Sequence, residues 1–322
     1  MEIEKLLSII ITTYNSEKTI KSCVESLYQQ IDRRVEIILI DDGSTDETVN
    51  IVRKNFSDVK VYCQKNSGVG IARNKGISIA SGKYVWFIDS DDSVPRNVIG
   101  QKFMKLFNLN YDLIIFGFFK KKNGKTIKVV NDKRYSFENN WHQNFENVFL
   151  NNALNPLWNK IYKREIIRKN NLKFNSFRSG EDAYFNYKLF LFTHKVLVVN
   201  KAIYNYNLFT ESSYKKVWNR ELHEDNLVRI TNLYNLLHEF GINKSYVGRN
   251  EVIDTLLGEE INIFKKYGRS INFQIYKREM EKISDDYKIP FNIPKLNKSF
   301  LKEKIVCSDL LSYLFIKLSG GI

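Results

Sequence analysis

Residues 84–92 read YVWFIDSDD, an apolar run that ends in three carboxylates within four residues. Two earlier segments have a similar design, since residues 6–15 read LLSIIITTYN and residues 35–44 read VEIILIDDGS. Runs that are apolar throughout are typical of strands buried on both faces, as in a parallel sheet covered by helices. Helical spacing is found between them over residues 16–30, 46–55 and 70–80, with one more strand over residues 59–64. The sequence therefore predicts an α/β fold with polar strand ends at one edge, where such sheets bind ligands.

The composition of the 322 residues excludes several classes of protein. Hydrophobic residues make up 43% and charged residues 27%, which is typical of a globular protein and not of a disordered or collagen-like chain. Three cysteines and four histidines are too few and too scattered for a disulfide framework or a structural zinc site. No apolar run reaches about 18 residues and no signal peptide is visible, so we expect a cytoplasmic protein without a membrane-spanning helix.

The net charge of +14 is unevenly distributed along the chain. Residues 101–216 hold 21 Lys and Arg against 8 Asp and Glu, a net charge of +13, whereas residues 1–100 are close to neutral. A basic region of this kind fits a nucleic acid, an anionic lipid surface or an anionic substrate. Charge alone does not choose among these partners, so the choice depends on motifs.

The acidic cluster Asp89-Ser90-Asp91-Asp92 predicts a cation site. Clustered carboxylates repel one another unless a cation is present, and Mg²⁺ and Mn²⁺ prefer oxygen ligands, which they share with phosphates. A solvated turn is the alternative for such a cluster taken alone. An EF-hand is excluded because Val94 stands where that loop needs glycine.

Two further segments carry polar residues beside the expected strand ends. In the turn Asp41-Asp42-Gly43-Ser44, a carboxylate can accept hydrogen bonds from a base or ribose, or the turn can simply cap the next helix. In residues 66–76, NSGVGIARNKG, Arg73 occupies the last glycine position of a dinucleotide loop, which disfavours a Rossmann dehydrogenase. Arg73 and Lys75 at a helix start suit an anionic ligand, and a solvated surface charge is the alternative.

Together these segments resemble the family 2 glycosyltransferases with the GT-A fold. The matching residues are those of 8–15, 41–44, 66–76 and 89–92, in the order and spacing of the family. Two later segments look like the same family, Trp158-Asn159-Lys160-Ile161-Tyr162-Lys163-Arg164-Glu165 and Gly180-Glu181-Asp182-Ala183-Tyr184-Phe185. The resemblance covers roughly residues 6–215. It implies a GT-A (Rossmann-like) mixed, mostly parallel sheet flanked by helices. The residue pattern itself predicts an exposed basic hairpin over residues 120–133, with its turn at Asn123-Gly124. It also predicts a helical C-terminal extension, and the helices expected in the second half of the chain are 162–170, 182–193, 217–240, 247–267, 273–288 and 299–318.

The resemblance implies an inverting glycosyltransferase of the bacterial cell-surface polysaccharide type. Such an enzyme would move a single sugar from a nucleotide-diphosphate sugar, with a UDP-sugar as the expected donor, to a hydroxyl of a glycan or lipid-linked acceptor. Thr13 replaces a proline often found in the first motif, which should alter only the loop. A QxxRW-type motif of processive membrane synthases is missing, which argues for transfer of one sugar at a time.

The resemblance also implies which residues bind the donor. The expected nucleotide-binding residues are Thr12, Tyr14, Asn15, Asp42, Arg73 and Asp89. Tyr14 would lie near the base, and Asp42 would accept a hydrogen bond from it. Asp91 and Asp89 would hold Mn²⁺ or Mg²⁺, with Asp91 as the better candidate for the metal.

The later segments would supply the base and the acceptor side. Asp182 would be the general base, with Glu181 beside it. Two carboxylates at a helix start can also simply complement the helix dipole. Trp158, Asn159 and Lys160 would shape the acceptor side, with a core tryptophan and a solvated lysine as the alternative.

The chain is expected to have three parts. Residues 1–100 would form the nucleotide-sugar-binding half of the GT-A domain, residues 101–216 the acceptor-binding half, and residues 217–322 a helical C-terminal region. Within the last part, the apolar spacing over residues 299–318 predicts packing against the catalytic domain or a second subunit, with a peripheral membrane contact as the alternative. The basic middle third would suit a lipid-linked diphosphate acceptor or the inner membrane face.

Two other classes of function fit parts of the sequence. A nucleotidyltransferase also uses an acidic metal site on an α/β sheet, but the Gly-rich phosphate loop near the N-terminus is missing. A basic nucleic-acid-binding protein would need aromatic residues on a basic groove. The near-neutral first third with its carboxylates disfavours that class, so we expect no nucleic-acid partner.

Overall fold

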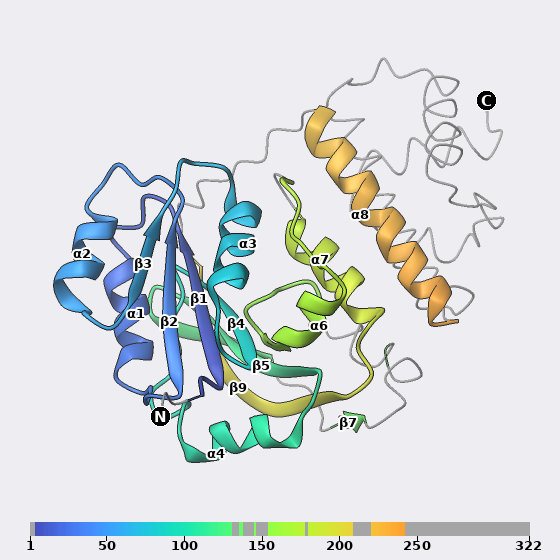
Figure 1. Cartoon of the computed structure of the whole chain (residues 1–322), viewed down its shortest axis with the longest axis horizontal. Coiled ribbons are helices and arrows are strands. Elements are labelled where there is room, and N and C mark those ends of the chain that lie inside the picture. The colour runs from blue at the N-terminus through green and yellow to red at the C-terminus, as the bar shows by residue number, and fades with distance from the viewer. Residues whose placement is uncertain are drawn as a thin grey trace. The chain divides into compact units, whose positions relative to one another are not determined.

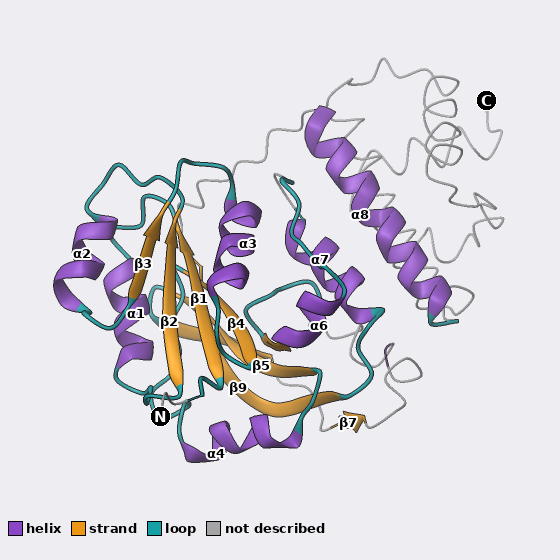
Figure 2. Ribbon diagram, viewed as in Figure 1, coloured by secondary structure: helices purple, strands orange, loops and turns teal. Residues whose placement is uncertain are grey.

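One nine-stranded sheet organises the part of the chain that the computed structural model describes, namely residues 4–130, 135–137, 145, 154–177, 180–208 and 220–241. The strands are β1 (Leu7–Thr13), β2 (Val35–Asp41), β3 (Lys60–Cys63), β4 (Tyr84–Asp89), β5 (Leu113–Lys122), β6 (Lys125–Val130), β7 (Tyr135–Phe137), β8 (Lys160–Lys163) and β9 (Val196–Leu208). Their order across the sheet is β3-β2-β1-β4-β8-β5-β9-β7, and β6 pairs with β5. Figure 2 shows the first four of these strands side by side. The mixed, mostly parallel sheet predicted from the sequence is confirmed.

The first half of the sheet is parallel and carries the polar strand ends. β1 pairs with β2 on one side and with β4 on the other, and β2 pairs with β3. The register places Thr12 beside Asp89 and Thr13 beside Asp41. The motifs that follow these strands therefore meet at one edge of the sheet, as the apolar runs predicted.

Helices cover both faces of this parallel half (Figure 1). They are α1 (Ile20–Tyr28), α2 (Thr48–Asn55), α3 (Val69–Ile79) and α4 (Gln101–Lys105), the last continuing into the 3-10 turn η1 (Leu106–Leu109). On one face, side chains of α1 join the β1 residues Ile9 and Ile11 in a large apolar core. On the other face, α3 lies so close to β1 that a Cβ at Gly76 would stand 2.5 Å from Ile10 Cγ2.

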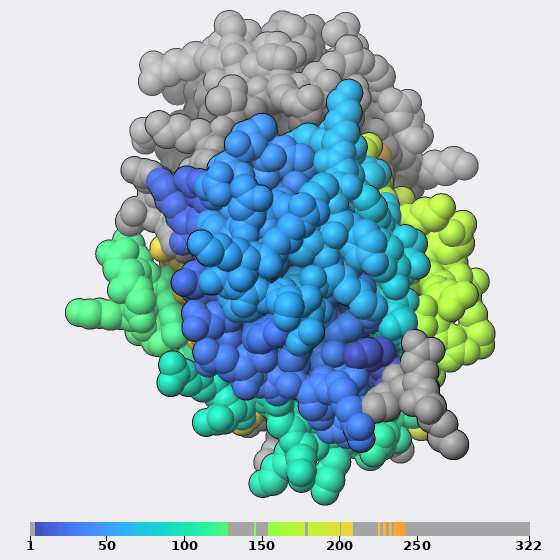
Figure 3. Space-filling view, turned by 60° about the vertical axis from the view of Figure 1, so that its left-hand side comes forward, coloured from blue at the N-terminus to red at the C-terminus, as the bar shows by residue number. Residues whose placement is uncertain are grey.

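The second half of the sheet is mixed. β8 runs antiparallel to β4 and β5, and β9 runs parallel to β5. β5 and β6 form the expected basic hairpin, which turns at Asn123 and Gly124, both with positive φ, and its tip projects from the surface (green in Figure 3). The sequence predicted a helix over residues 162–170. The structure places the strand β8 before a shorter helix, α6 (Arg164–Lys169).

Two more helices complete the described part of the chain. α7 (Glu181–Phe190) and α8 (Arg220–Glu239) lie where the sequence predicted helices over residues 182–193 and 217–240. In this part of the chain, no helix is both long and apolar enough to span a bilayer. The helical segments expected over residues 247–267, 273–288 and 299–318 lie outside the described residues, and so does the predicted contact of the last one with a membrane or a second subunit.

Candidate active site

Arg73 lies at the centre of the polar edge and joins motifs that are far apart in the sequence. Its guanidinium donates to Asp89 Oδ1 at 3.2 Å, to Glu181 Oε1 at 3.0 Å and to Asp182 Oδ1 at 2.6 Å. Only 4% of Arg73 is exposed, and its guanidinium also lies 5.5 Å from the ring centroid of Phe174. Four of the residues predicted for the site are thus in direct contact: Arg73, Asp89, Glu181 and Asp182.

The position of Arg73 follows from how α3 is seated. A Cβ at Gly70 would lie 2.3 Å from the backbone oxygen of Asn175, so only glycine allows α3 this close to that loop. One turn further, the Asn74 side chain donates to Phe174 O at 2.7 Å and accepts from Phe174 N at 2.9 Å. These contacts hold the N-terminal half of α3, and with it Arg73, between β4 and the start of α7.

The three carboxylates around Arg73 share a single cation. Burial raises the pKa of Asp182 to about 8, because the charge of Glu181 adds to the effect and Arg73 opposes it only in part. For Arg73 itself, burial would lower the pKa, but Asp182, Asp89 and Glu181 outweigh burial and raise it. Asp182 is therefore a carboxylate with the elevated basicity that a general base requires.

The acidic cluster after β4 divides into one structural carboxylate and one open carboxylate. Asp92 is buried and accepts from Tyr204 Oη at 2.8 Å and from Asn207 N at 2.7 Å. Asp91 reaches the surface, and among the described residues no other side chain pairs with its carboxylate. Partial burial and the charge of Asp89 raise the pKa of Asp91 to about 6. The cluster therefore leaves Asp91 free to bind a ligand.

The residues present fit a divalent cation. Asp91 and the second oxygen of Asp89 are hard oxygen donors, and the raised pKa of Asp91 is what partial burial and a neighbouring carboxylate produce. Within the described ranges, no group of three His, Cys, Asp or Glu side chains is arranged to hold a metal ion.

Asp42 is buried and holds the loop 64–68 through hydrogen bonds. Its Oδ1 accepts from Gln64 Nε2 at 2.8 Å and Ser67 N at 2.9 Å, and its Oδ2 accepts from Gly68 N at 2.8 Å. A carboxylate has about four acceptor positions, so one more hydrogen bond is available on Asp42. Its predicted contact with a base stays a prediction, and its contacts with the loop 64–68 were not foreseen.

The motif that follows β1 provides an exposed aromatic ring and a loop that is held by hydrogen bonds. Tyr14 is 51% exposed, which leaves its ring open to stacking. Asn15, with φ +47°, accepts from Thr45 N at 2.9 Å through its side-chain oxygen, and its backbone N–H donates to Ser44 Oγ at 2.9 Å. Thr12 lies beside Asp89 but is mostly buried. The predicted nucleotide contacts of these three residues remain predictions.

The segment 158–160 lies in the core. Trp158 stacks on Tyr204, with ring centroids 4.7 Å apart, and Asn159 and Lys160 are fully buried. Lys160 Nζ donates to Pro156 O and to Asn159 Oδ1, and burial lowers the pKa of its ammonium. The structure therefore contradicts the alternative of a solvated lysine and agrees with a core tryptophan. The predicted role on the acceptor side has no exposed surface of Asn159 or Lys160 to support it.

Some residues of the polar edge were missed by sequence reasoning. In the described part of the chain, Thr13 Oγ1 and Asp41 Oδ1 are buried and have no hydrogen-bond partner, although they lie side by side at the ends of β1 and β2. Tyr204 links β9 to the acidic cluster through Asp92 and by accepting from Asp89 N at 3.3 Å. The signal for Thr13 and Asp41 was present, because both lie within motifs that the sequence analysis quoted.

The comparison with known families uses the same residues. Residues 8–170 match the family described as Glycosyl transferase family 2, which is half of the chain. The chain belongs to this family. Membership in the family 2 glycosyltransferases confirms the resemblance drawn from the motifs, and it disfavours a nucleotidyltransferase or a nucleic-acid-binding protein.

Related proteins of bacteria are also named as glycosyltransferases. The chain is 29% identical over 230 residues to "Glycosyltransferase GlyA" of Streptococcus pneumoniae, an alignment that covers 68% of this chain and 32% of GlyA. It is 28% identical to the "Poly(ribitol-phosphate) beta-N-acetylglucosaminyltransferase TarP" of Staphylococcus aureus, over 86% of this chain and 84% of TarP. Among solved structures, residues 1–349 of S. aureus TarS in complex with UDP are 26% identical with a TM-score of 0.58, over 73% of this chain and 68% of that chain. The chain thus spans about a third of GlyA and most of TarP.

Proposed function

We propose that this family 2 glycosyltransferase transfers a single sugar, with inversion, from a UDP-sugar to a hydroxyl of a glycan or lipid-linked acceptor in cell-surface polysaccharide synthesis. The choice of UDP is supported by the UDP complex of TarS, and the acceptor class by the name of TarP. The observation that carries the proposal is the contact of Arg73 with Asp89, Glu181 and Asp182. It brings the expected donor residues and the expected base to one place.

The donor would lie across the carboxyl ends of β1, β2 and β4. Tyr14 stacks on the base, and Asp42 accepts a hydrogen bond from the base edge with its remaining acceptor position. Thr13 and Asp41 lie beside this region, and their unpartnered oxygens would gain hydrogen bonds from a bound nucleotide or from a water that accompanies it. Arg73 lies next to the expected position of the diphosphate, behind Asp89.

Asp182 would act as the general base. The acceptor hydroxyl gives its proton to Asp182 while its oxygen forms a bond to the anomeric carbon and the bond from that carbon to the diphosphate breaks. Arg73 keeps Asp182 oriented through the 2.6 Å contact, and burial makes the ionised Asp182 a better proton acceptor than a solvated carboxylate. Glu181 would share Arg73 and keep the local charge negative enough for proton transfer to Asp182.

Asp91 and Asp89 would hold Mn²⁺ or Mg²⁺. When bound, such an ion neutralises the negative charge that develops on the leaving diphosphate. The cation site depends on Asp91 in particular, because Asp89 is already paired with Arg73 and Asp92 with Tyr204.

A donor screen tests this function. UDP-, GDP- and dTDP-sugars are incubated with the full chain and a mixed acceptor pool, with and without Mn²⁺, and nucleotide release is measured. We expect release of UDP that requires both the metal and an acceptor. Release of pyrophosphate instead would mean nucleotidyl transfer, and release of another nucleotide would overturn the choice of UDP.

Asp91→Asn separates metal binding from the rest of the site. Calorimetry should show that Mn²⁺-dependent UDP binding is lost in Asp91→Asn but kept in Asp92→Asn, provided that the latter folds, because Asp92 faces Tyr204. Unchanged Mn²⁺-dependent binding in Asp91→Asn would remove Asp91 from the metal site.

A further inference from the structure

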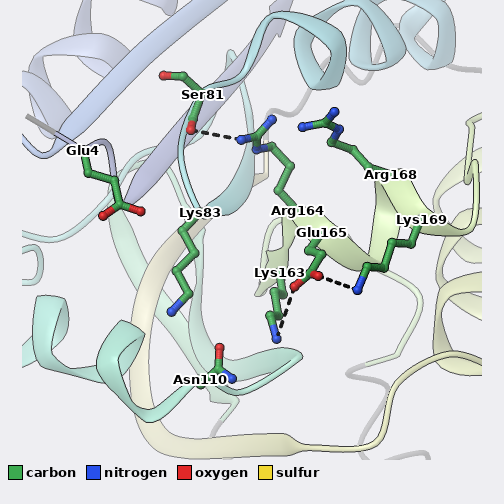
Figure 4. Close-up of a pocket in the computed structure, with 9 residues that line it drawn as sticks. All are labelled: Glu4, Ser81, Lys83, Asn110, Lys163, Arg164, Glu165, Arg168 and Lys169. Atoms are coloured by element: carbon green, nitrogen blue, oxygen red, sulfur yellow. Dashed lines mark hydrogen bonds and ion pairs between the residues drawn. The ribbon is translucent and has the colours of Figure 1, made fainter. Parts of the chain in front are cut away.

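A cavity lies at the edge of the sheet opposite the candidate active site, where the parallel strands begin. Its volume is about 630 Å³, within the range of small-molecule sites. It is formed where the segments before β1, β4 and β5 meet the end of β8 and the helix α6 (Figure 4). The lining residues are Glu4, Ser81, Lys83, Asn110, Lys163, Arg164, Glu165, Arg168 and Lys169.

The lining is strongly basic. Five of these side chains are Lys or Arg and two are carboxylates, and four of the five cations come from the seven residues 163–169. They belong to the basic middle third of the chain, whose net charge of +13 the proposed glycosyl transfer does not use. A cavity with such an excess of cations attracts anions.

Three of the cations are engaged by the protein. Lys169 pairs with Glu165 at 2.5 Å, and Lys163 lies 3.7 Å from both Glu165 and Asp112. Arg164 donates to the backbone oxygens of Gly82 and Ser81, which fixes the wall between α6 and the start of β4. Because the partners of Arg164 are neutral, its charge is held in place but not neutralised.

The other two cations are available to a ligand. Within the described ranges, neither Lys83 nor Arg168 has an ion pair or a side-chain hydrogen bond, and Lys83 Nζ lies over the Tyr84 ring at 5.8 Å from its centroid. Figure 4 shows the two side chains with Arg164 between them. Burial and the charge of Arg168 lower the pKa of Arg164, as expected for a cation among cations. Glu4, at the rim, is the remaining carboxylate of the lining.

The cavity is separate from the candidate active site. Lys83 precedes β4 and Asp89 ends it, so six strand residues lie between the two edges. At about 3.3 Å per residue, the strand alone separates them by roughly 20 Å. A nucleotide-sugar bound at the carboxyl edge therefore does not reach this cavity.

We propose that the cavity binds a phosphate group, as a phosphate monoester or diester. Arg168 offers a planar fork of donors that fits two phosphate oxygens, and Lys83 adds a point charge on the opposite wall. Arg164 and Lys163 hold further positive charge around the anion. The phosphate can belong to a lipid headgroup or to a free phosphate ester, and the chemistry of recognition is the same for both.

The test uses the full chain with Lys83→Gln and Arg168→Gln combined. The matched control is Arg53→Gln combined with Lys54→Gln, which removes the same two charges from exposed positions on α2. One arm measures binding of inorganic phosphate by ³¹P line broadening, without UDP and with one equivalent of UDP to occupy the candidate active site. The other measures sedimentation with phosphatidylcholine vesicles that contain about one-third phosphatidylglycerol, against vesicles of phosphatidylcholine alone.

We expect the double variant of the cavity to lose roughly 10- to 30-fold in affinity, because each cation near an anionic group contributes on the order of 1 kcal/mol. The control should stay near the wild type, and both variants should keep the wild-type circular dichroism and UDP binding. Loss in the vesicle arm assigns the phosphate to a lipid headgroup, and loss in the phosphate arm alone assigns it to a free ester. Absence of binding by the wild type in both arms, or equal binding by the cavity variant and the control, would overturn the proposal.

Discussion

Three carboxylates at the two edges of the parallel sheet, Asp91, Asp182 and Glu36, have pKa values that are shifted in opposite directions. At the carboxyl edge, Asp91 and Asp182 have raised pKa values of about 6 and about 8. At the amino edge, Glu36 is buried, but its pKa is lowered to about 2. The same residue chemistry is therefore used in two different ways.

The difference lies in the number of donors. Glu36 accepts from Ser8 Oγ, from Ser81 N and Oγ, and from Lys60 Nζ, so four donors serve one carboxylate. Burial alone would raise the pKa of Glu36, but these contacts outweigh it. Around Arg73, three carboxylates share one guanidinium. A carboxylate that accepts hydrogen bonds at all its oxygen positions stabilises the fold, whereas one that has too few donors can bind a proton or a cation.

The largest expected effect is on turnover. Asp182→Asn keeps the shape of the side chain but cannot accept a proton, so kcat should fall by roughly 10²-fold or more while UDP and Mn²⁺ binding persist. Glu181→Gln, assayed at saturating donor, is the matched control and should retain most of its turnover. A dead Glu181 variant beside an active Asp182 variant would reverse the two roles, and full activity in both would place the base elsewhere.

The next effect is on stability and concerns Glu36. A folded-state pKa of about 2 against an unfolded value near 4.5 means that ionised Glu36 stabilises the fold above about pH 4.5, by on the order of 3 kcal/mol. This contribution is lost as the pH falls from about 4.5 towards 2. Urea unfolding at pH 7 should therefore show Glu36→Gln destabilised by about 2–3 kcal/mol, with little change for the exposed Glu25→Gln. Equal stability of the two variants would contradict the comparison.

Asp42 is the exception that sharpens the comparison. It lies at the carboxyl edge, yet three donors already serve it, as at the amino edge. Asp42→Ala should raise the donor KM by an amount corresponding to about 1–3 kcal/mol, because a buried hydrogen-bonding partner is lost. Asp42→Asn keeps one acceptor oxygen and should recover part of the affinity. Unchanged donor affinity in Asp42→Ala would mean that Asp42 only supports the loop 64–68.

The smallest effect is the pH dependence of turnover. The active form of Asp182 is ionised, so kcat should rise with pH and level off near the raised pKa of about 8, falling about tenfold per pH unit below it. The residual activity of Asp182→Asn should lack this dependence. If kcat of the wild type does not change from pH 6 to pH 9, the raised pKa of Asp182 does not control the reaction.

Much of the parallel half could be predicted from the sequence, because continuous apolar runs that end in Asp, Asn or Thr specify both the strands and their ligand edge. The contact of Arg73 with Glu181 and Asp182 was not predictable from spacing, since about 108 residues separate the partners and only the fold brings them together. The sequence offered an acceptor-side role or a solvated position for Lys160 but not a core position, because lysine seldom enters a core. It does so here because Pro156 O and Asn159 Oδ1 accept from its ammonium.

The different roles of Asp91 and Asp92 in the acidic cluster could not be predicted from the sequence either. Asp91 and Asp92 are adjacent and chemically alike, yet one is exposed and the other is buried against Tyr204, which is 112 residues away. The helix predicted over residues 162–170 includes Tyr162 and Lys163 of β8, because this strand runs directly into α6. Short strands that pair only at long range leave little local pattern.

The close seating of α3 has a consequence for building hybrid enzymes. Gly70 and Asn74 belong to the expected donor half, and Phe174 and Asn175 to the expected acceptor half, but they meet without room for a single extra carbon. A hybrid that joins two family members at residue 100 should therefore fold and work only when the residues at positions 70, 74, 174 and 175 are compatible with one another. Exchange of the two halves among relatives is thus limited by this one close backbone contact.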